Sequence, residues 1–124
     1  MKYNLNKNLK NKLSILLYHG VTNKKNKGIV NLQGKHLDKD EFISQMEFIN
    51  KRCSPISIEQ WVEMKLNNKP IPEYPTIVSF DDGFKNNKTI AAPILDHLDI
   101  PSVFYISTGV IDNNKMFWVD IIEQ

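Results

Sequence analysis

The sequence predicts an α/β protein with parallel strands. Three short apolar runs suited to buried strands, residues 13–19, 76–80 and 102–107, alternate with segments of helical period. Parallel neighbours need a crossover connection, usually a helix, so this alternation favours parallel strands over hairpins. With 124 residues, 41% of them hydrophobic and 24% charged, the chain suits one globular domain rather than a disordered segment.

The first strand follows a polar segment. Residues 1–12 are expected to form a frayed lead-in, and residues 13–19 (LSILLYH) a strand that ends in a turn at Gly20. Residues 20–37 carry Asn, Lys and Gly without a period and are predicted to form a loop. The first apolar run is shorter than the roughly 7–15 residues of a signal-peptide core. No run approaches the roughly 20 residues of a membrane span. As written, the chain is expected in the cytoplasm.

Two amphipathic helices are predicted next. The first has Asp38 as N-cap, with Glu41 three residues later to complete a capping box. Three apolar residues recur at i, i+4 and i+7 and share one face of this helix: Phe42, Met46 and Ile49. The second helix begins with the capping pair Ser57 and Gln60, and its Trp61 is expected in the core.

The C-terminal part should contain two more helices. Residues 86–98 have a helical pattern, and Pro93 within it predicts a kink. A further helix is expected to begin near Lys115. In the strand between them, Phe104 and Tyr105 alternate, so one should face the helices and the other the opposite side of the sheet.

The strongest chemical signal is Asp81-Asp82-Gly83, directly after strand 76–80. In parallel α/β folds the functional crevice lies beyond the carboxyl ends of the strands. Successive residues leaving a strand point in different directions, so one carboxylate can bind a metal while the other faces a substrate. Gly83 permits a sharp turn and the close approach of a ligand. The plain alternative is an acidic turn, because Asp and Gly are common turn residues.

Five segments resemble, in order, those of the polysaccharide deacetylases of the NodB-like family (carbohydrate esterase family 4). They are residues 17–21 (LYHGV), 42–46 (FISQM), 79–84 (SFDDGF), 92–95 (APIL) and 100–106 (IPSVFYI). Ser79 stands where the family motif usually has threonine. The resemblance covers residues 13–118 and marks residues 13–124 as the N-terminal part of such a domain. It implies a partial, distorted (β/α) barrel, truncated after about three core strands.

This resemblance also implies a reaction. Asp81 would be the general base and Asp82 a metal ligand in the hydrolytic N-deacetylation of an acetylated amino-sugar polysaccharide or oligosaccharide. Zinc is the implied metal, with cobalt or nickel as alternatives. A divalent metal lowers the pKa of bound water toward about 7, and a carboxylate within hydrogen-bond reach can then take the proton. His19, Gly83 and Phe84 are expected to contact the substrate.

The metal site is incomplete in this sequence. The family adds a His-(Ser/Thr)-x-x-His pair and a later catalytic histidine, whereas the three histidines here are His19, His36 and His97, no two of them four residues apart. Zinc sites need about three protein ligands. The sequence therefore predicts a missing C-terminal half and no deacetylase activity from this chain alone. Residues 115–122 resemble the start of an insertion before that pair, and His36 and His97 are expected to be ordinary surface residues.

Two other functions stay open at this point. A strand-end Asp pair can bind Mg²⁺ in a phosphoryl-transfer or phosphatase-like domain, but that leaves the Tyr-His-Gly segment without a role. The second open function is that of a truncated or degenerate deacetylase domain that does not catalyse the reaction. Residues 1–37 hold eight lysines and no acid, yet they are rich in Asn and interrupted by apolar residues, so nucleic acid is not expected as a partner. The single Cys53 excludes an internal disulfide and a multi-cysteine zinc site.

Overall fold

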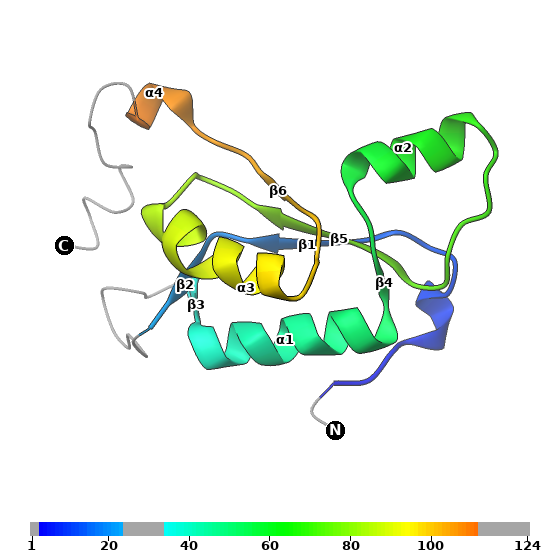
Figure 1. Cartoon of the computed structure of the whole chain (residues 1–124), viewed down its shortest axis with the longest axis horizontal. Coiled ribbons are helices and arrows are strands. Elements are labelled where there is room, and N and C mark those ends of the chain that lie inside the picture. The colour runs from blue at the N-terminus through cyan, green and yellow to red at the C-terminus, as the bar shows by residue number, and fades with distance from the viewer. Residues whose placement is uncertain (1–2, 24–33, 112–124) are drawn as a thin grey trace.

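The computed structural model describes residues 3–23 and 34–111. Its main sheet is built from four parallel strands: β1 (Ser14–Tyr18), β4 (Ser54–Pro55), β5 (Pro75–Phe80) and β6 (Ser102–Phe104). β5 lies at the centre (Figure 1). One of its edges pairs with β1 along its whole length, and the other is shared by β4 at its start and β6 at its end. The predicted parallel α/β fold is confirmed.

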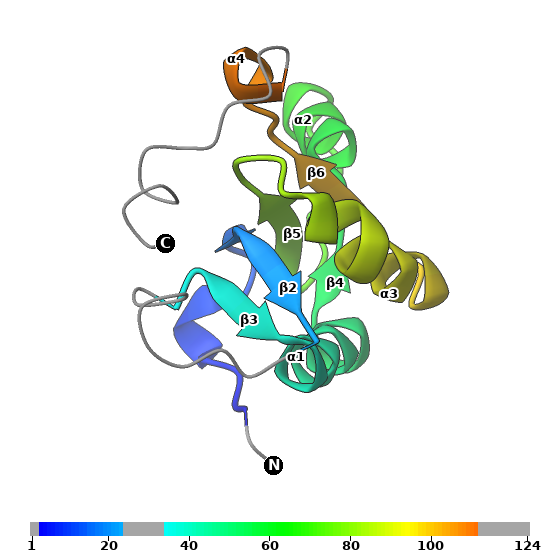
Figure 2. The ribbon, with the colours of Figure 1, turned by 90° about the vertical axis from the view of Figure 1, so that its left-hand side faces the viewer.

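A second, smaller sheet corrects the prediction of a loop over residues 20–37. Its strands, β2 (Gly20–Thr22) and β3 (His36–Asp38), are parallel, with Gly20 opposite His36. Figure 2, which looks onto the left-hand end of Figure 1, shows the pair beside the end of the main sheet. Strands of three residues are too short to show a period, so they could not be predicted from the hydrophobic pattern. The two-residue strand β4 escaped prediction for the same reason.

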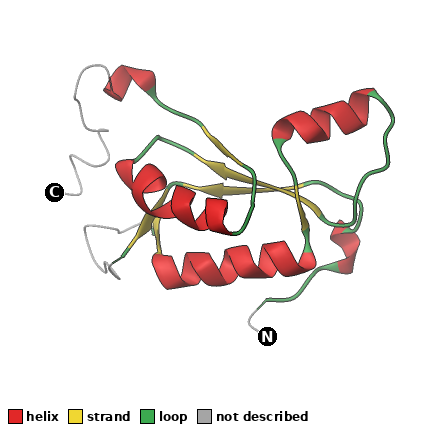
Figure 3. Ribbon diagram, viewed as in Figure 1, coloured by secondary structure: helices red, strands yellow, loops and turns green. Residues whose placement is uncertain are grey.

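The helices account for most of the remaining described residues (Figure 3). They are the 3₁₀ turn η1 (Lys7–Leu9), α1 (Lys39–Arg52), α2 (Ile58–Leu66), the π-helical turn η3 (Asn87–Ala91), α3 (Ala92–His97) and α4 (Thr108–Ile111). The helix predicted near Lys115, and the segment 115–122, lie outside the described residues. None of the described helices is long and apolar enough to cross a membrane.

Both predicted N-caps, Asp38 and Ser57, are confirmed, but at α1 the Asp38 side chain caps the Asp40 amide rather than forming the predicted box with Glu41. The Asp38 carboxylate accepts a hydrogen bond from the Asp40 amide at 3.1 Å. At α2, Ser57 Oγ accepts from the Gln60 amide at 3.2 Å, while Gln60 Oε1 accepts from the Ser57 amide at 2.8 Å. This second pair is a complete capping box, and each such cap contributes about 1 kcal/mol to stability.

The core lies between the main sheet and the helices α1 and α3. Its buried members are Val21, Phe42, Met46, Ile49, Val78, Phe80, Ala91, Leu95 and Ile100. The apolar face predicted for α1 is therefore confirmed. Phe80 is at its centre, with its ring 5.9 Å from that of Phe42 and stacked at 4.8 Å on that of Phe104. Tyr105, the next residue along, is 51% exposed, which fits the predicted alternation. Burial of each large apolar side chain stabilises the fold by about 1.5–3 kcal/mol.

Helix α2 contributes less to this core than its sequence suggests. None of its residues is fully buried, and its apolar Val62 and Leu66 are 45% and 76% exposed. Trp61, predicted to lie in the core, is half-buried, and the Lys65 ammonium sits 5.1 Å from its ring centre. Figure 1 shows α2 set apart from the layer that α1 and α3 form.

The predicted helix over residues 86–98 is continuous but changes type. In η3 the Ala92 amide donates to the carbonyl of Asn87, five residues back, before α3 continues with ordinary α-helical bonds. Pro93, near the start of α3, has no N–H to donate to the preceding turn, and the change from π-helical to α-helical bonding falls directly before it. π-helical turns occur frequently at functional sites, and this one follows the Asp81-Asp82 pair closely.

In the described part of the N-terminal segment, Tyr3 contacts α1, whereas residues 6–12 are exposed. The ring of Tyr3 lies 5.5 Å from that of Phe48 on α1, and its hydroxyl donates to Glu41. Lys10 forms an exposed ion pair with Glu73 at 2.5 Å. The segment has too few apolar positions for these contacts to be predicted from the sequence.

The sheet face opposite the core is open on β1. Along that strand Leu16 and Tyr18 pack toward the core, whereas Ile15 and Leu17 are 61% and 57% exposed. The described strands form no closed barrel. Exposed apolar residues on an edge strand promote association with other chains.

We therefore expect the wild-type chain to self-associate and to be only marginally stable. The double variant Ile15→Thr/Leu17→Thr should remain monomeric in sedimentation velocity at concentrations where the wild type associates, because threonine keeps strand propensity without the apolar surface. Leu16→Thr is the matched control. It should not restore the monomer and should lower the free energy of unfolding by about 1–3 kcal/mol. A wild-type chain that stays monomeric and unfolds sharply would contradict this expectation.

A second prediction concerns Tyr18. Burial, with smaller effects from Tyr3 and Glu41, raises its pKa from 10.0 to about 12, while its hydroxyl donates to Gln45 Oε1 at 2.7 Å. Because the pKa of Tyr18 is higher in the folded than in the unfolded state, its contribution to the free energy of unfolding is complete below about pH 10. That contribution is lost as the pH rises toward about 12. Tyr18→Phe should cost about 1 kcal/mol at neutral pH. Urea unfolding at about pH 8 and about pH 11 should show a smaller alkaline loss in this variant than in the wild type.

Candidate functional site

The carboxyl ends of β1 and β5 meet at one end of the sheet. Tyr18 and Phe80 are partners in the parallel pairing, and the Asp81 amide donates to the Tyr18 carbonyl at 2.9 Å. His19 and Asp81 therefore leave adjacent strands side by side, as the sequence predicts. This end faces the viewer in Figure 2.

Ser79 ties the two strands together from within the motif. Its side chain is 2% exposed, and its hydroxyl donates to the Leu16 carbonyl at 2.9 Å. A buried hydroxyl without a partner would be destabilising. The Leu16 carbonyl supplies that partner, so the Ser79 hydroxyl helps to hold β1 against β5.

The residues after Asp81 form a tight, left-handed turn. Asp82 and Gly83 have φ angles of 68° and 75°, and the Gly83 amide donates to the Asp81 carbonyl at 2.9 Å. At Gly83, a Cβ would lie 3.2 Å from Cγ2 of Ile106, so both the φ angle and the neighbouring side chain favour glycine. Asp82 takes up the same region despite its side chain, as do Asn11, Asn68, Tyr74 and Asp99 elsewhere in the described residues.

The turn orients the Asp81 carboxylate. Oδ1 accepts a hydrogen bond from the Asp82 amide at 2.9 Å, and the residue is half-buried. One oxygen is thereby fixed, so that the carboxylate can take a proton on the other.

His36 belongs to this end of the sheet, which corrects its prediction as an ordinary surface residue. It is half-buried, its ring centre is 4.8 Å from that of Phe84 at an interplanar angle of 71°, and its Nδ1 lies 3.3 Å from Asn86 Nδ2. Lys35 Nζ lies 5.8 Å from the same Phe84 ring. A histidine in a segment without a period carries no sequence signal that would have indicated this position.

The close contacts around Gly20 explain why the Tyr-His-Gly segment has glycine at this position. A Cβ at this position would lie 2.2 Å from His36 Nδ1 and 2.8 Å from Asn86 Oδ1, distances that real Cβ atoms do not show. Glycine therefore gives His36 and Asn86 room to lie against the backbone that follows His19.

The described residues do not by themselves complete a metal site. No group of three or more His, Cys, Asp or Glu side chains converges within 3–23 and 34–111, whereas zinc needs about three protein ligands. His19 is half-buried and follows β1 directly, but it does not turn Asp81 and Asp82 into a three-residue ligand set.

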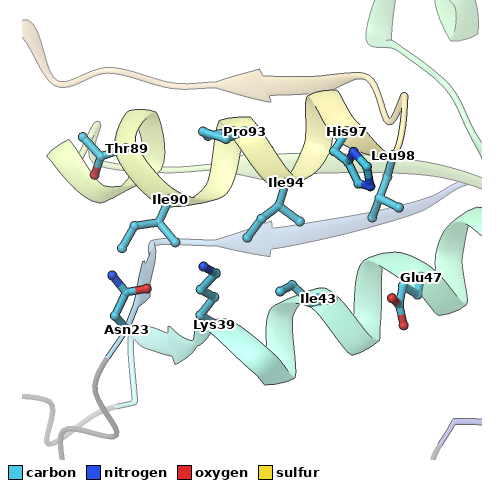
Figure 4. Close-up of a pocket in the computed structure, with 10 residues that line it drawn as sticks. All are labelled: Asn23, Lys39, Ile43, Glu47, Thr89, Ile90, Pro93, Ile94, His97 and Leu98. Atoms are coloured by element: carbon cyan, nitrogen blue, oxygen red, sulfur yellow. The ribbon is translucent and has the colours of Figure 1, made fainter.

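Cavities also occur among the described residues away from this end. A groove of about 410 Å³ separates α1 from the helix η3–α3, with Ile43, Ile90 and Ile94 facing across it and the exposed His97 on its margin (Figure 4). His97 is thus a surface residue, as predicted. A second cavity, of about 310 Å³, lies between the N-terminal segment and α1 and includes Cys53. Neither is lined by Asp81, Asp82 or His19.

Solved structures of longer proteins share this fold. A de-N-acetylase from Aggregatibacter actinomycetemcomitans superposes with a TM-score of 0.72 and 24% identity over 85% of this chain and 42% of its own. A deacetylase from Streptococcus pyogenes, solved in complex with acetate, gives 0.66 and 21% over 84% and 45%. A polysaccharide deacetylase from Bacillus cereus gives 0.58 and 26% over 84% and 31%.

The match is therefore partial in length. The chain spans between 31% and 45% of these three solved proteins. No protein-family model and no curated protein matches the sequence.

The fit around Gly20 yields a third prediction. Gly20→Ala should displace His36 and lower the free energy of unfolding by about 1–3 kcal/mol, because the added methyl overpacks a site that is already in contact. Gly109→Ala is the matched control, since a Cβ there meets nothing within 4 Å, and it should leave stability unchanged or raise it slightly. Urea unfolding measures both. Equal stability of Gly20→Ala and the wild type would contradict the described contact.

Proposed function

Because the chain shares the fold of polysaccharide deacetylases over the part of their length that it spans, we propose that the complete domain deacetylates an acetylated amino-sugar polymer or oligomer. The reaction is a metal-dependent hydrolysis that releases acetate and leaves a free amine. The observation that carries the proposal is the Asp81-Asp82 pair in a strained turn at the carboxyl end of the central strand, beside His19.

In this proposal Asp81 is the general base. Hydrolysis forms a bond between a water oxygen and the acetyl carbon, breaks the carbon–nitrogen bond and moves a proton to the leaving amine. Asp81 is suited to take the water proton, because its Oδ1 is held by the Asp82 amide at 2.9 Å and the carboxylate cannot rotate freely.

Asp82 is the proposed metal ligand. A bound divalent metal, zinc or alternatively cobalt or nickel, would supply Lewis-acid polarisation of the carbonyl and acidification of water. The described residues do not complete its ligand set, so the remaining ligands come from outside them, in a C-terminal half of the domain. His19, Gly83 and Phe84 lie around the pair and are proposed to face the substrate.

A non-catalytic domain is the second candidate for this chain. It is favoured by one observation, the lack of a converging group of three potential ligands among residues 3–23 and 34–111. In that case the chain would retain the fold shared with the deacetylases but would not catalyse deacetylation. The two candidates differ in whether supplying the rest of the domain restores activity.

We predict that the 124-residue chain alone releases no acetate above background from acetylated chitooligosaccharides with Zn²⁺, Co²⁺ or Ni²⁺. An ion held by one carboxylate binds weakly and does not fix the geometry of attack. A version extended through a His-(Ser/Thr)-x-x-His segment should be active and should lose at least about 100-fold on Asp81→Asn or Asp82→Ala. Asp96→Asn, an exposed carboxylate on α3, is the matched control and should retain activity.

Two results would count against this proposal. Acetate release by the 124-residue chain that disappears in Asp81→Asn would show that its own residues complete the site. An extended version that binds metal but stays inactive on every acetylated amino sugar would favour the non-catalytic domain.

A further inference from the structure

The His36 side chain lies between the two motif segments at the carboxyl end of the sheet. On one side it contacts the backbone of Gly20, its partner in the β2–β3 pairing. On the other its ring meets that of Phe84 at 4.8 Å, and its Nδ1 lies 3.3 Å from Asn86 Nδ2. One imidazole thus bridges the segment after β1 and the segment after Asp82.

The turn that directly precedes Phe84, formed by Asp81, Asp82 and Gly83, is expected to need contacts with neighbouring segments to hold its conformation. Asp82 adopts a φ of 68°, a left-handed conformation that is less favourable for a residue with a Cβ than for glycine. The Asp81 amide ties the start of the turn to the Tyr18 carbonyl of β1, whereas the bonds from Asp82 to Asp81 Oδ1 and from Gly83 to the Asp81 carbonyl lie within the turn and do not anchor its far side. Strained backbone persists where the surrounding structure over-determines it.

The bridge continues into the helix that follows. Asn86 directly precedes η3, and the Asn87 amide donates to the Phe84 carbonyl at 2.9 Å. Holding Phe84 and Asn86 therefore holds both ends of the link between the turn and η3. A contact at either residue restricts where the Asp81-Asp82 turn can lie.

We propose that His36 is a positioning residue that fixes the Asp81-Asp82 turn relative to the end of β1. It acts through Phe84 by packing and through Asn86 by a hydrogen bond. The consequence for catalysis rests on the proposed function, whereas the positioning itself requires neither metal nor substrate.

The chemistry of the contact suggests two complementary variants. The Asn86 amide nitrogen can only donate, so His36 Nδ1 is the acceptor. His36→Phe keeps a ring beside Phe84 but removes the acceptor, and Asn86→Ala removes the donor while leaving the histidine in place. His97→Phe, at an exposed position on α3, is the matched control.

Amide hydrogen exchange, measured by NMR on the full 124-residue chain, distinguishes positioning from a general effect on stability. In both test variants we expect the Asp82 and Gly83 amides to exchange about fivefold faster, the effect of losing one net hydrogen bond. The Val78 amide in the centre of β5 should change by less than about twofold. His97→Phe should change the exchange rate of neither the turn amides nor the Val78 amide.

Three results would overturn the proposal: unchanged turn amides in both variants, a parallel rise at Val78 and in the turn, or the loss of folding in both. The second and third would make His36 a determinant of the whole fold. If only one of the two variants fails to fold, the exchange rates of the other variant decide whether the proposal holds. The exchange assay contains no metal or substrate, so a result against the positioning role of His36 would not bear on the proposed deacetylation. Conversely, an inactive extended domain would not bear on the positioning role.

Discussion

The parallel pairing of β1 with β5 is the interaction on which the candidate site depends. The pairing runs from Ser14–Thr76 to Tyr18–Phe80, and the Ser79 hydroxyl adds a side-chain bond to the Leu16 carbonyl. A shift of one residue would turn every side chain of β1 to the other face of the sheet. Tyr18 would then leave the core, and His19 would no longer emerge beside Asp81.

The sequence predicted this arrangement because its signals are local and strong. Strand β5 is a β-branched apolar run, and the Asp-Asp-Gly that ends it needs no distant residue to be recognised. Buried Phe42, Met46 and Ile49 on α1 followed from helical spacing alone. The resemblance to deacetylases then supplied the roles of Asp81 and Asp82, which no geometry of the described residues could have assigned.

The parts that escaped prediction depend on contacts between distant segments. β2, β3 and β4 have two or three residues each, too few for a period. His36 lies beside Gly20 and Phe84 through the β2–β3 pairing, 50 residues away from Asn86 in the chain. Trp61 was expected in the core from its helical position, but α2 does not lie over the sheet. In each case tertiary packing overrode or replaced the local pattern.

The proposed metal site is the turn at the end of β5, where Asp82 would be a ligand. Paramagnetic broadening by Mn²⁺ in the ¹H–¹⁵N spectrum of the 124-residue chain tests it directly, even for weak binding. The account predicts that broadening is strongest at Asp81, Asp82 and Gly83, extends to His19, and is lost in Asp82→Ala. Broadening centred on the exposed Asp96 and Asp99 instead, and unaffected by Asp82→Ala, would contradict it.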